Sequence, residues 1–221
     1  KSKYIRQSWV ILTIFLIAGL NPVFGQKKVG TTIFQFLKVM PDAHGTGMGD
    51  AVTSTINNAN AAFYNPAGLT GVDKLDLSFS SYKYFFDVKT TSISLAYKMG
   101  LYGTLGFHFI NTDIGKIEVT SVDQLGFGDD GTFNPGLTGE TINPKQMVIG
   151  LSYARSLTEK FSFGINLKYA REDMIKADAD GLVFDFGLVY KTGYRSIQTS
   201  AVIRNFGPEI SFSDDEGTTN N

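Results

Sequence analysis

Apolar and polar residues alternate with a period of two through most of the chain after residue 74. In segment 161–169 the odd positions hold Phe, Phe, Ile, Leu and Tyr, and the even positions hold Ser, Gly, Asn and Lys. Such alternation places one set of side chains on each face of an extended strand. It predicts strands at 75–86, 90–98, 100–110, 146–155, 160–171, 181–191 and 196–206.

The alternation fits two architectures, because apolar side chains can line a soluble core or face lipid. Small and polar residues fill the opposite face, which suits the polar lumen of a barrel. Aromatic girdles mark the interfaces of membrane barrels, and here tyrosine repeatedly ends the apolar faces, at Tyr97, Tyr153, Tyr169 and Tyr190. These features favour an all-β fold, an antiparallel transmembrane β-barrel, over a soluble secreted β-sandwich.

The links between the predicted strands also alternate in length. The short links are 98–100, 156–159 and 192–195, and the longer ones are 111–145, 172–180 and the tail after 207. Short periplasmic turns and longer extracellular loops are typical of outer-membrane barrels. Within the longest link, the stretch KIEVTSV is expected to form a strand extension above the membrane. Bacterial barrels close with an even number of strands, so about seven strands indicate a fragment that lacks C-terminal strands.

The start of the chain has the layout of a secretory signal peptide. Three cations within 1–6 precede an apolar run at 9–20, and Asn21-Pro22 and a small-residue site follow up to Gly25. A retained membrane anchor is the alternative, but the run is shorter than the ~20 apolar residues that a helical span needs. We therefore predict a signal peptide at 1–25, location in the outer membrane of a Gram-negative bacterium, and a periplasmic N-terminus.

Composition and charge exclude several function classes. The 221 residues carry a formal net charge of -1, which provides no basic field for nucleic acid, and the absence of cysteine removes disulfides and thiolate metal sites. The sequence GTGMG does not follow a strand of a βαβ unit, so nucleotide binding is not expected. With two histidines and no readable Ser/His arrangement, we expect neither catalysis, nor a cofactor, nor a metal. The acidic clusters Asp129-Asp130 and Asp214-Asp215-Glu216 are interpreted as solvated loop surface.

Segment 26–74 does not alternate, and it is rich in small residues and amides. A short helix could begin near Thr31 or Thr32, 44–50 is interpreted as a glycine-rich bend, and 59–64 as a helical turn. Asn65 is a plausible N-cap with Pro66 at the first helical position. Because small residues allow close backbone approach, we predict that 26–74 is a plug for a barrel formed by 75–221.

The stretch 30–69 resembles the N-terminal signature of the PorV/PorQ family of outer-membrane proteins, which are similar in architecture to the FadL long-chain fatty-acid transporters. Segment 201–208, AVIRNFGP, also resembles a strand of that family. His44 departs from the pattern, since members often carry Arg there. The motif residues assigned to the plug are Pro41, Asp42, Ala43, Gly45, Gly47, Met48, Gly49, Asp50, Asn65, Pro66, Ala67, Gly68 and Leu69.

The resemblance implies a FadL-like barrel of about 14 strands when complete. It also implies a non-enzymatic component of type IX secretion that binds the translocon, secreted cargo or both. A FadL-like passive transporter of hydrophobic small molecules is the alternative. An apolar lumen pocket beside Met48 and Phe63 would favour the transporter, and a polar, filled lumen would favour the binding component.

The polar residues expected to face the lumen are Asn166, Lys168, Asp185, Gln198 and Arg204. If 160–171 and 181–191 form a hairpin, Lys168 and Asp185 lie within diagonal reach on the lumen face. We predict that they interact with each other or with the plug.

Overall fold

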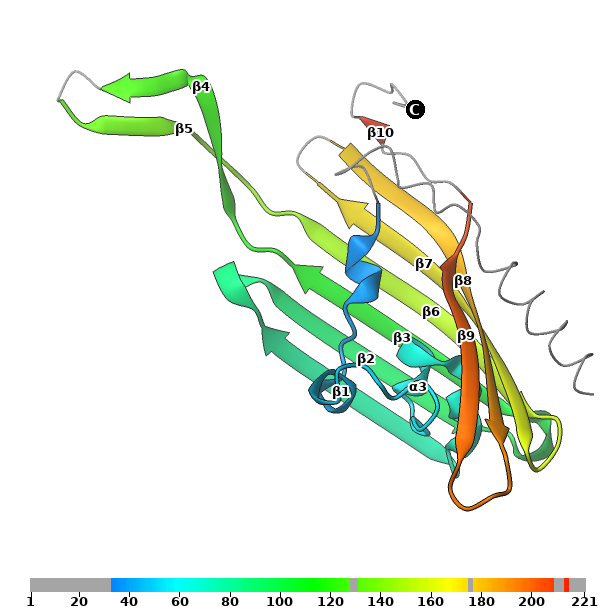
Figure 1. Cartoon of the computed structure of the whole chain (residues 1–221). Helices are drawn as coiled ribbons and strands as arrows, with labels where there is room; N and C mark the ends of the chain where they lie inside the picture. The colour runs from blue at the N-terminus through cyan, green and yellow to red at the C-terminus, as the bar shows by residue number, and fades with distance from the viewer. Residues whose placement is uncertain (1–32, 128–130, 175–176, 209–212, 215–221) are drawn as a thin grey trace, which may run out of the picture. The chain divides into compact units, whose positions relative to one another are not determined.

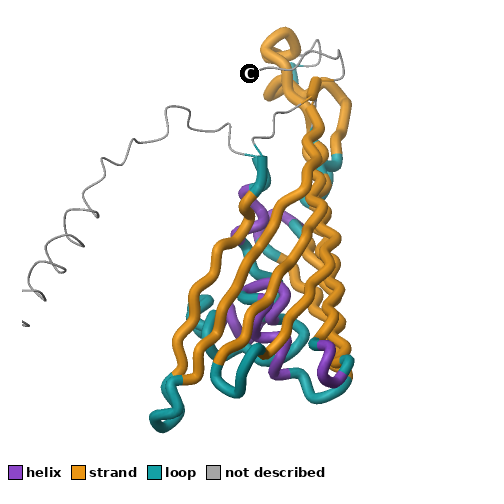
Figure 2. Tube along the Cα trace, turned by 90° about the vertical axis from the view of Figure 1, so that its right-hand side faces the viewer, coloured by secondary structure: helices purple, strands orange, loops and turns teal. Residues whose placement is uncertain are grey.

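The computed structural model describes residues 33–127, 131–174, 177–208 and 213–214. These residues form an all-β protein in which one antiparallel sheet carries short helices on its inner face (Figures 1 and 2). The predicted signal peptide, Thr31, Thr32, Asp129-Asp130 and Asp215-Glu216 lie outside the described residues.

The main sheet has the order β1-β2-β3-β6-β7-β8, and β8 then pairs with both β9 and β10. All of these neighbours are antiparallel. Within the described residues the sheet is open, with β1 at one edge and β9 and β10 at the other. The bounds are β1 Leu75–Lys83, β2 Lys89–Lys98, β3 Thr104–Asp113, β6 Lys145–Ser156, β7 Phe161–Asp173, β8 Ala177–Lys191, β9 Gln198–Phe206 and β10 Ser213–Asp214.

The expected link at 172–180 is wrong. β7 runs to Asp173 and β8 begins at Ala177, with Arg171 paired to Asp180 across the ladder. Charged residues at these positions do not break a strand, because Arg171, Asp173 and Asp180 are exposed, the buried Glu172 has hydrogen-bond partners, and the backbone ladder continues. The alternation of short and long links is therefore less regular than the sequence indicated.

The sequence analysis also made two strands too long, at the end of the first (75–86) and at the start of the third (100–110). β1 stops at Lys83, and Phe85–Asp87 form a 3₁₀ turn, η3. β3 starts at Thr104, because Gly100–Tyr102 form another 3₁₀ turn, η4.

The long link between β3 and β6 contains a separate hairpin. The predicted strand at KIEVTSV is confirmed as part of β4, Ile117–Phe127, and it pairs with β5, Phe133–Ile142, which the sequence analysis missed. The hairpin extends beyond the ends of the other strands (Figure 1). With β10, it raises the strands of the described residues to ten, in place of the seven expected.

Residues 33–74, here called the N-terminal segment, contain four short helical elements. They are η1 Gln35–Lys38, α2 Ala43–Gly47, α3 Ala61–Tyr64 and η2 Pro66–Gly71. Interpretation of 44–50 as only a bend is wrong, because α2 forms there with the Asp42 carboxylate accepting from the Gly45 backbone N–H at 2.8 Å. The predicted turn at 59–64 is confirmed by α3.

No helix among the described residues has the length and apolar character needed to cross a membrane.

The two faces of the sheet have opposite chemistry, and the apolar one is uncovered. On β7 the buried positions are the small and polar ones, whereas Ile165 and Leu167 on the other face are 48% and 41% exposed. The N-terminal segment covers the small, polar face, here called the inner face. A soluble sheet normally buries its apolar face, so this arrangement is inverted.

Glycines on the inner face let the N-terminal segment approach the sheet closely. A Cβ at Gly164 would lie 2.3 Å from the Ala67 nitrogen, and one at Gly187 would lie 2.0 Å from Asn65 Oδ1. These distances are too short for any side chain, so the Asn65-Pro66-Ala67 stretch rests directly on the backbone of β7 and β8.

Replacing Gly164 by Val is expected to lower the free energy of unfolding by about 1–3 kcal/mol, because the side chain would displace the backbone at 66–67. Urea unfolding in detergent, followed by far-UV circular dichroism, measures this. Ala201→Val, at an exposed position of β9, is the control and should change stability by less than ~0.5 kcal/mol. Equal losses in both variants would contradict the close approach at Gly164.

Candidate functional site

A buried ion pair lies at the centre of the interface between the N-terminal segment and the sheet. Lys168 Nζ on β7 is 2.8 Å from Asp185 Oδ1 on β8, and the two side chains are 9% and 2% exposed. The register pairs Lys168 with Val183 and Asn166 with Asp185, so the two charges are diagonal neighbours on the inner face. The predicted interaction of Lys168 and Asp185 is confirmed.

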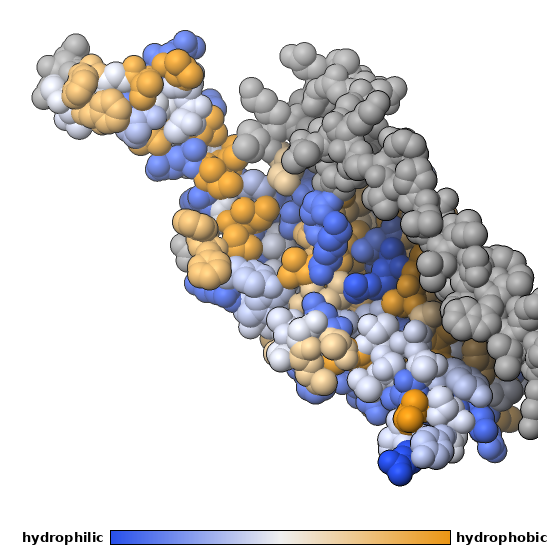
Figure 3. Space-filling view, in the orientation of Figure 1, coloured by the Kyte–Doolittle hydropathy of each residue, from blue (hydrophilic) through white to orange (hydrophobic). Residues whose placement is uncertain are grey.

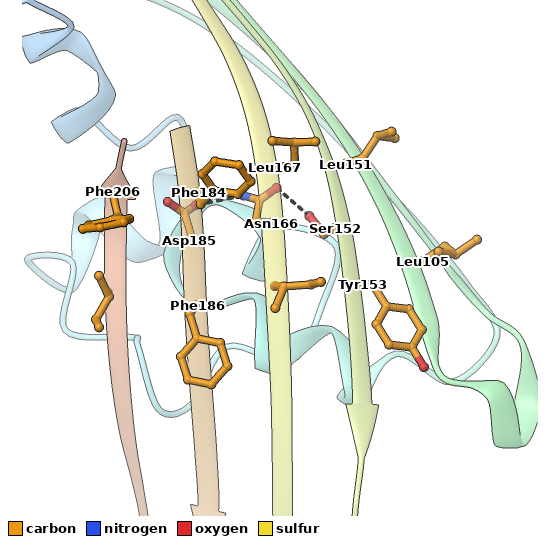
Figure 4. A pocket seen from close by; sticks show the side chains of 12 residues that line it. Leu105, Leu151, Ser152, Tyr153, Asn166, Leu167, Phe184, Asp185, Phe186 and Phe206 are labelled. Atoms are coloured by element: carbon orange, nitrogen blue, oxygen red, sulfur yellow. Dashed lines mark hydrogen bonds between the residues drawn. The ribbon is translucent and has the colours of Figure 1, made fainter. Parts of the chain in front are cut away.

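Amides and a hydroxyl extend this pair into a network. Asn166 Nδ2 donates to Asp185 Oδ2 at 2.9 Å and to the Ala62 carbonyl of α3 at 3.1 Å. Its Oδ1 accepts from Ser152 Oγ on β6 at 3.1 Å (Figure 4). Asn166 therefore connects three strands to the N-terminal segment, and its donors and acceptor are all used within the protein.

The same carboxylate fixes an irregularity in β9. Asp185 Oδ1 accepts from the Asn205 backbone N–H at 2.7 Å, and Lys168 donates to the Asn205 side chain. Asn205 has φ of 55°, and the β8–β9 register shifts between Phe184 and Phe186. A side-chain acceptor replaces the ladder hydrogen bond that the bulge interrupts.

Asn65 joins the N-terminal segment to β8. Its Oδ1 accepts from the Ala67 N–H at 3.1 Å, which confirms the predicted cap at the start of η2 with Pro66 at the first helical position. Its Nδ2 donates to the Thr53 carbonyl at 3.0 Å and to the Leu188 carbonyl at 3.2 Å. The side chain is fully buried, and each of its polar atoms has a partner.

A second chain of polar contacts runs from α2 to β2. Asp42, besides capping α2, accepts from Asn60 Nδ2 at 2.8 Å, and Asn60 Oδ1 accepts from Ser94 Oγ at 2.7 Å. Pro41 contributes its carbonyl, which accepts from Ser92 Oγ at 3.5 Å. Two of the predicted motif residues thus attach the N-terminal segment to a different strand from the one that Asn65 contacts.

Glu172 was expected in a loop, but it is buried at the upper end of β7. Its Oε2 accepts from the Phe34 backbone N–H at 2.9 Å and its Oε1 from Gln146 Nε2 at 2.9 Å. The alternation that places Lys168 and Ala170 on the inner face continues to position 172. Extending that parity by one step would have found this residue in the sequence.

His108 points to the inner face as expected. It is 1% exposed and packs edge to face on Phe63, with ring centroids 5.2 Å apart. Gly150 on the neighbouring strand makes room, because a Cβ there would lie 2.1 Å from the imidazole. The ring fills space between α3 and the sheet.

The GMGD turn lies at the surface of the N-terminal segment. Gly49 and Asp50 adopt left-handed backbone angles, with φ of 64° and 61°, and Met48 is 50% exposed. Asp50 Oδ1 accepts from the Tyr64 hydroxyl at 3.1 Å. Burial, together with this hydrogen bond, raises the pKa of the Tyr64 phenol. A Cβ at Gly45 would meet that hydroxyl at 2.1 Å, which explains the glycine in α2.

The remaining motif positions have packing roles or are open. Ala67 and Leu69 are fully buried on the inner face, and Gly68 lies against the Ile56 carbonyl, 2.3 Å from where its Cβ would be. Ala43 begins α2, and a Cβ at Gly47 would have no heavy atom within 4 Å.

Arg204 and Gln198 lie on the inner side of β9. Arg204 Nη1 approaches Met40 Sδ at 3.3 Å. Gln198 pairs with Lys191 in the ladder, and both line an open hollow beside 54–57. Neither joins the Lys168–Asp185 network through a direct hydrogen bond in the described part of the chain. Hydrophilic surface is visible in the middle of the inner face (Figure 3).

The space beside Phe63 is small. A cavity of about 20 Å³ lies between Phe63, His108, Lys168 and apolar side chains of η1 and β6, and Met48 does not line it. This volume accommodates about one water molecule. Within the described residues, no group of three or more His, Asp or Glu side chains is arranged to hold a metal ion.

The arrangement immobilises a segment of backbone against a sheet. Each polar residue described above contacts the N-terminal segment or a neighbouring strand. The buried charges either form an ion pair, as Lys168 and Asp185 do, or accept hydrogen bonds from backbone N–H groups, as Glu172 and Asp42 do. No protein-family model matches the chain, and a search of curated proteins found no significant match.

Lys168→Met is expected to lower the free energy of unfolding by about 3–5 kcal/mol, because it leaves a buried carboxylate without its cation. Asp185→Asn should also destabilise, and the double variant should lose at least ~1 kcal/mol less than the sum of the single losses. Arg171→Met removes one partner of the half-exposed Arg171–Asp178 pair and should cost less than ~1 kcal/mol. Additive losses at 168 and 185 would contradict a coupled pair.

Asn65→Ala is expected to cost about 2–3 kcal/mol, since it removes a cap and leaves two carbonyl groups without a donor. Asn65→Asp keeps the acceptor for Ala67 but places a carboxylate beside the Thr53 and Leu188 carbonyls, so it should be at least as destabilising. The loss of stability in the two variants is compared by thermal unfolding under identical solution conditions. A mild effect of Asn65→Asp would mean that the cap alone matters.

Proposed function

We propose that the chain forms part of an outer-membrane β-barrel of the PorV/PorQ type, and that this barrel is a non-enzymatic binding component of type IX protein secretion. The N-terminal segment is its plug, and its partners are membrane lipid, the translocon and secreted cargo. The observation that carries the proposal is the inverted sheet, with its polar face filled and its apolar face exposed.

The exposed face supports a location in lipid. On β7 the outward residues from Phe161 to Tyr169 form an apolar row, and the next outward residue is the exposed Arg171. Eight residue steps at ~3.3 Å give a row of about 26 Å along the strand, which at a tilt of ~40° spans about 20 Å of the ~25 Å apolar band of barrels. An apolar surface of this extent on a soluble monomer would promote association.

The open edges support further strands beside β1 and β9. In lipid, unpaired backbone N–H and C=O groups cost several kcal/mol each, so only closed barrels span a membrane with strands. The outward positions next to both edges are apolar and exposed, with Phe79 at 66% and Ile203 at 60%. A barrel of about 14 strands would continue this surface on each side.

The filled inner face supports a binding component over the FadL-like transporter. The cavity beside Phe63 is too small for a hydrophobic ligand, and the Asn166 amide on the same face donates to the Ala62 carbonyl of the N-terminal segment. An apolar hollow of about 650 Å³ does exist, but its apolar side chains, including Leu151, Leu167 and Phe186, belong to the outward face (Figure 4). Lipid chains would fill it in the proposed barrel.

Membrane insertion can be tested with two leucines of similar exposure. Leu151 in β6 is 62% exposed, and Leu157 in the β6–β7 turn is 58% exposed. Leu151→Arg is expected to make the free energy of folding into vesicles less favourable by about 2–4 kcal/mol. Residue 157 lies in the turn beyond the apolar row, so Leu157→Arg should cost less than ~1 kcal/mol. The measurement is the folded fraction in vesicles as a function of urea. Equal tolerance of both variants would indicate a soluble protein.

The secretion role is tested by purifying the complete gene product in mild detergent from its own outer membrane, with mass spectrometry of the bound molecules. Recovery of a large translocon barrel or of secreted cargo is the expected result. A lone barrel that carries fatty acid or another apolar ligand would favour the transporter and contradict the secretion role.

A further inference from the structure

The outward face of the β1–β2 hairpin changes in chemical character towards the turn that joins the two strands. In that direction its last three cross-strand pairs on this face are Phe79–Ile93, Ser81–Thr91 and Lys83–Lys89. The first pair is apolar, the second has hydroxyl oxygens 3.4 Å apart, and the third is cationic. This order matches the passage from acyl chains to phosphate groups in a lipid leaflet.

The two lysines are a like-charge pair. Lys83 and Lys89 are directly opposite in the register, where Cβ atoms lie ~5 Å apart, and both side chains are exposed. Asp113 is the partner of Lys89 on β3, and its Oδ1 accepts from the Gly115 N–H at 3.0 Å. Neither lysine forms an ion pair with any side chain that the structure describes. Like charges directly opposite destabilise a ladder, so an anion bound between them would relieve a repulsion.

The turn between the lysines exposes aromatic rings. The sequence from 83 to 89, here called the hairpin tip, is KYFFDVK, and Phe85 and Phe86 in η3 are 84% and 94% exposed. Phe86 has φ of 56°, a left-handed conformation that is unfavourable for a bulky residue. Packing within the described part of the chain does not explain a strained ring that is almost fully exposed. Such an outlier points to a bound partner.

Cations beside exposed aromatic rings suit a phosphorylated sugar. A lysine ammonium group binds phosphate oxygens as a point charge, and the electron-rich face of an aromatic ring packs against the C–H groups of a sugar. The like-charge pair favours an anionic partner, and its place at the end of the outward apolar face favours a lipid headgroup.

The lysine pair lies at the height of lipid headgroups in the proposed barrel. The four residue steps from Phe79 to Lys83 cover ~13 Å along the strand, which is ~10 Å along the barrel axis at a tilt of ~40°. The headgroup layer on each side of a bilayer is about 5–8 Å thick, and lysine side chains can reach back towards it.

We propose that the hairpin tip binds the phosphorylated sugar headgroup of an outer-leaflet glycolipid. Lys83 and Lys89 hold a phosphate group, and Phe85 and Phe86 cover the sugar. The inference rests on the proposed outer-membrane location, because the tip is at the same end of the sheet as the β4–β5 hairpin, the extracellular end of the proposed barrel (Figure 1). The bound glycolipid neutralises the lysine pair and stabilises the β1–β2 hairpin.

The test uses the complete gene product, purified in a zwitterionic detergent with a metal chelator, and isothermal titration calorimetry. The probes are diphosphoryl lipid A and phosphatidylglycerol, each dissolved in the same detergent. Lys83→Gln/Lys89→Gln is compared with Lys160→Gln/Lys191→Gln, which removes two exposed lysines at the opposite end of the sheet. The tip variant is expected to bind lipid A at least about tenfold more weakly than the wild type, and the control variant should bind it as the wild type does.

Phe86→Gly separates a binding role of the ring from a structural one. Glycine adopts a φ of 56° without strain, so this variant should be at least as stable as the wild type. It is nevertheless expected to bind lipid A at least about threefold more weakly, whereas Leu101→Gly, at a 91% exposed position of η4, should bind normally. Unchanged binding by Phe86→Gly would overturn the role of the ring.

The outcomes separate the lipid classes. Binding of lipid A that depends on 83 and 89 and is tighter than binding of phosphatidylglycerol supports the glycolipid site. Equal binding of the two lipids overturns the sugar assignment, because phosphatidylglycerol offers a phosphate without a sugar. An equal loss in both lysine variants, or no binding by the wild type, overturns the site.

Flotation of the same proteins with phosphatidylcholine vesicles, which carry no net charge, reports membrane insertion independently. A protein that inserts but does not bind lipid A contradicts the glycolipid site alone. A protein that does not insert contradicts the proposed membrane location, so the two failures are distinguishable.

Discussion

The structure depends on one constraint, the need to cover a sheet face made of small and polar residues. Such a face offers only small apolar clusters, such as Val148 and Val183 beneath Phe34, so hydrogen bonds and close backbone approach must add to the contact. The N-terminal segment meets both needs. Asn65 and Asn60 donate and accept across the interface, and Gly164 and Gly187 let the backbone of the segment rest on the sheet. The opposite face then carries most of the large apolar side chains, while Val148, Val183 and Ile110 pack against the N-terminal segment.

The buried charges follow from the same constraint. A lone Lys168 on this face would carry a large desolvation cost, which Asp185, Asn166 and Asn205 together offset. The network is specific in geometry because its members come from β6, β7, β8, β9 and the N-terminal segment. It therefore fixes the register of the β7–β8 hairpin, the bulge in β9 and the position of α3 at one point.

The apolar outer face and the filled inner face lead to one functional interpretation. In the proposed barrel, an apolar outer face suits lipid, and an inner face covered by the N-terminal segment leaves little room for transported cargo. In this proposal, protein partners would bind at surfaces beyond the main sheet, such as the β4–β5 hairpin.

The sequence by itself determined the strands of the main sheet, the assignment of residues to its faces, the Asn65 cap and the diagonal pairing of Lys168 with Asp185. These features depend on local spacing, and a period of two can be recognised in a single strand. The sequence did not reveal α2, the length of the β7–β8 hairpin, the strand β5 or the role of Glu172. Asp42 and Glu172 each find their partners through the fold, 18 residues away at Asn60 and 138 residues away at Phe34. Only the tertiary structure decides such features, because the energy of a long-range contact depends on which segments the fold brings together.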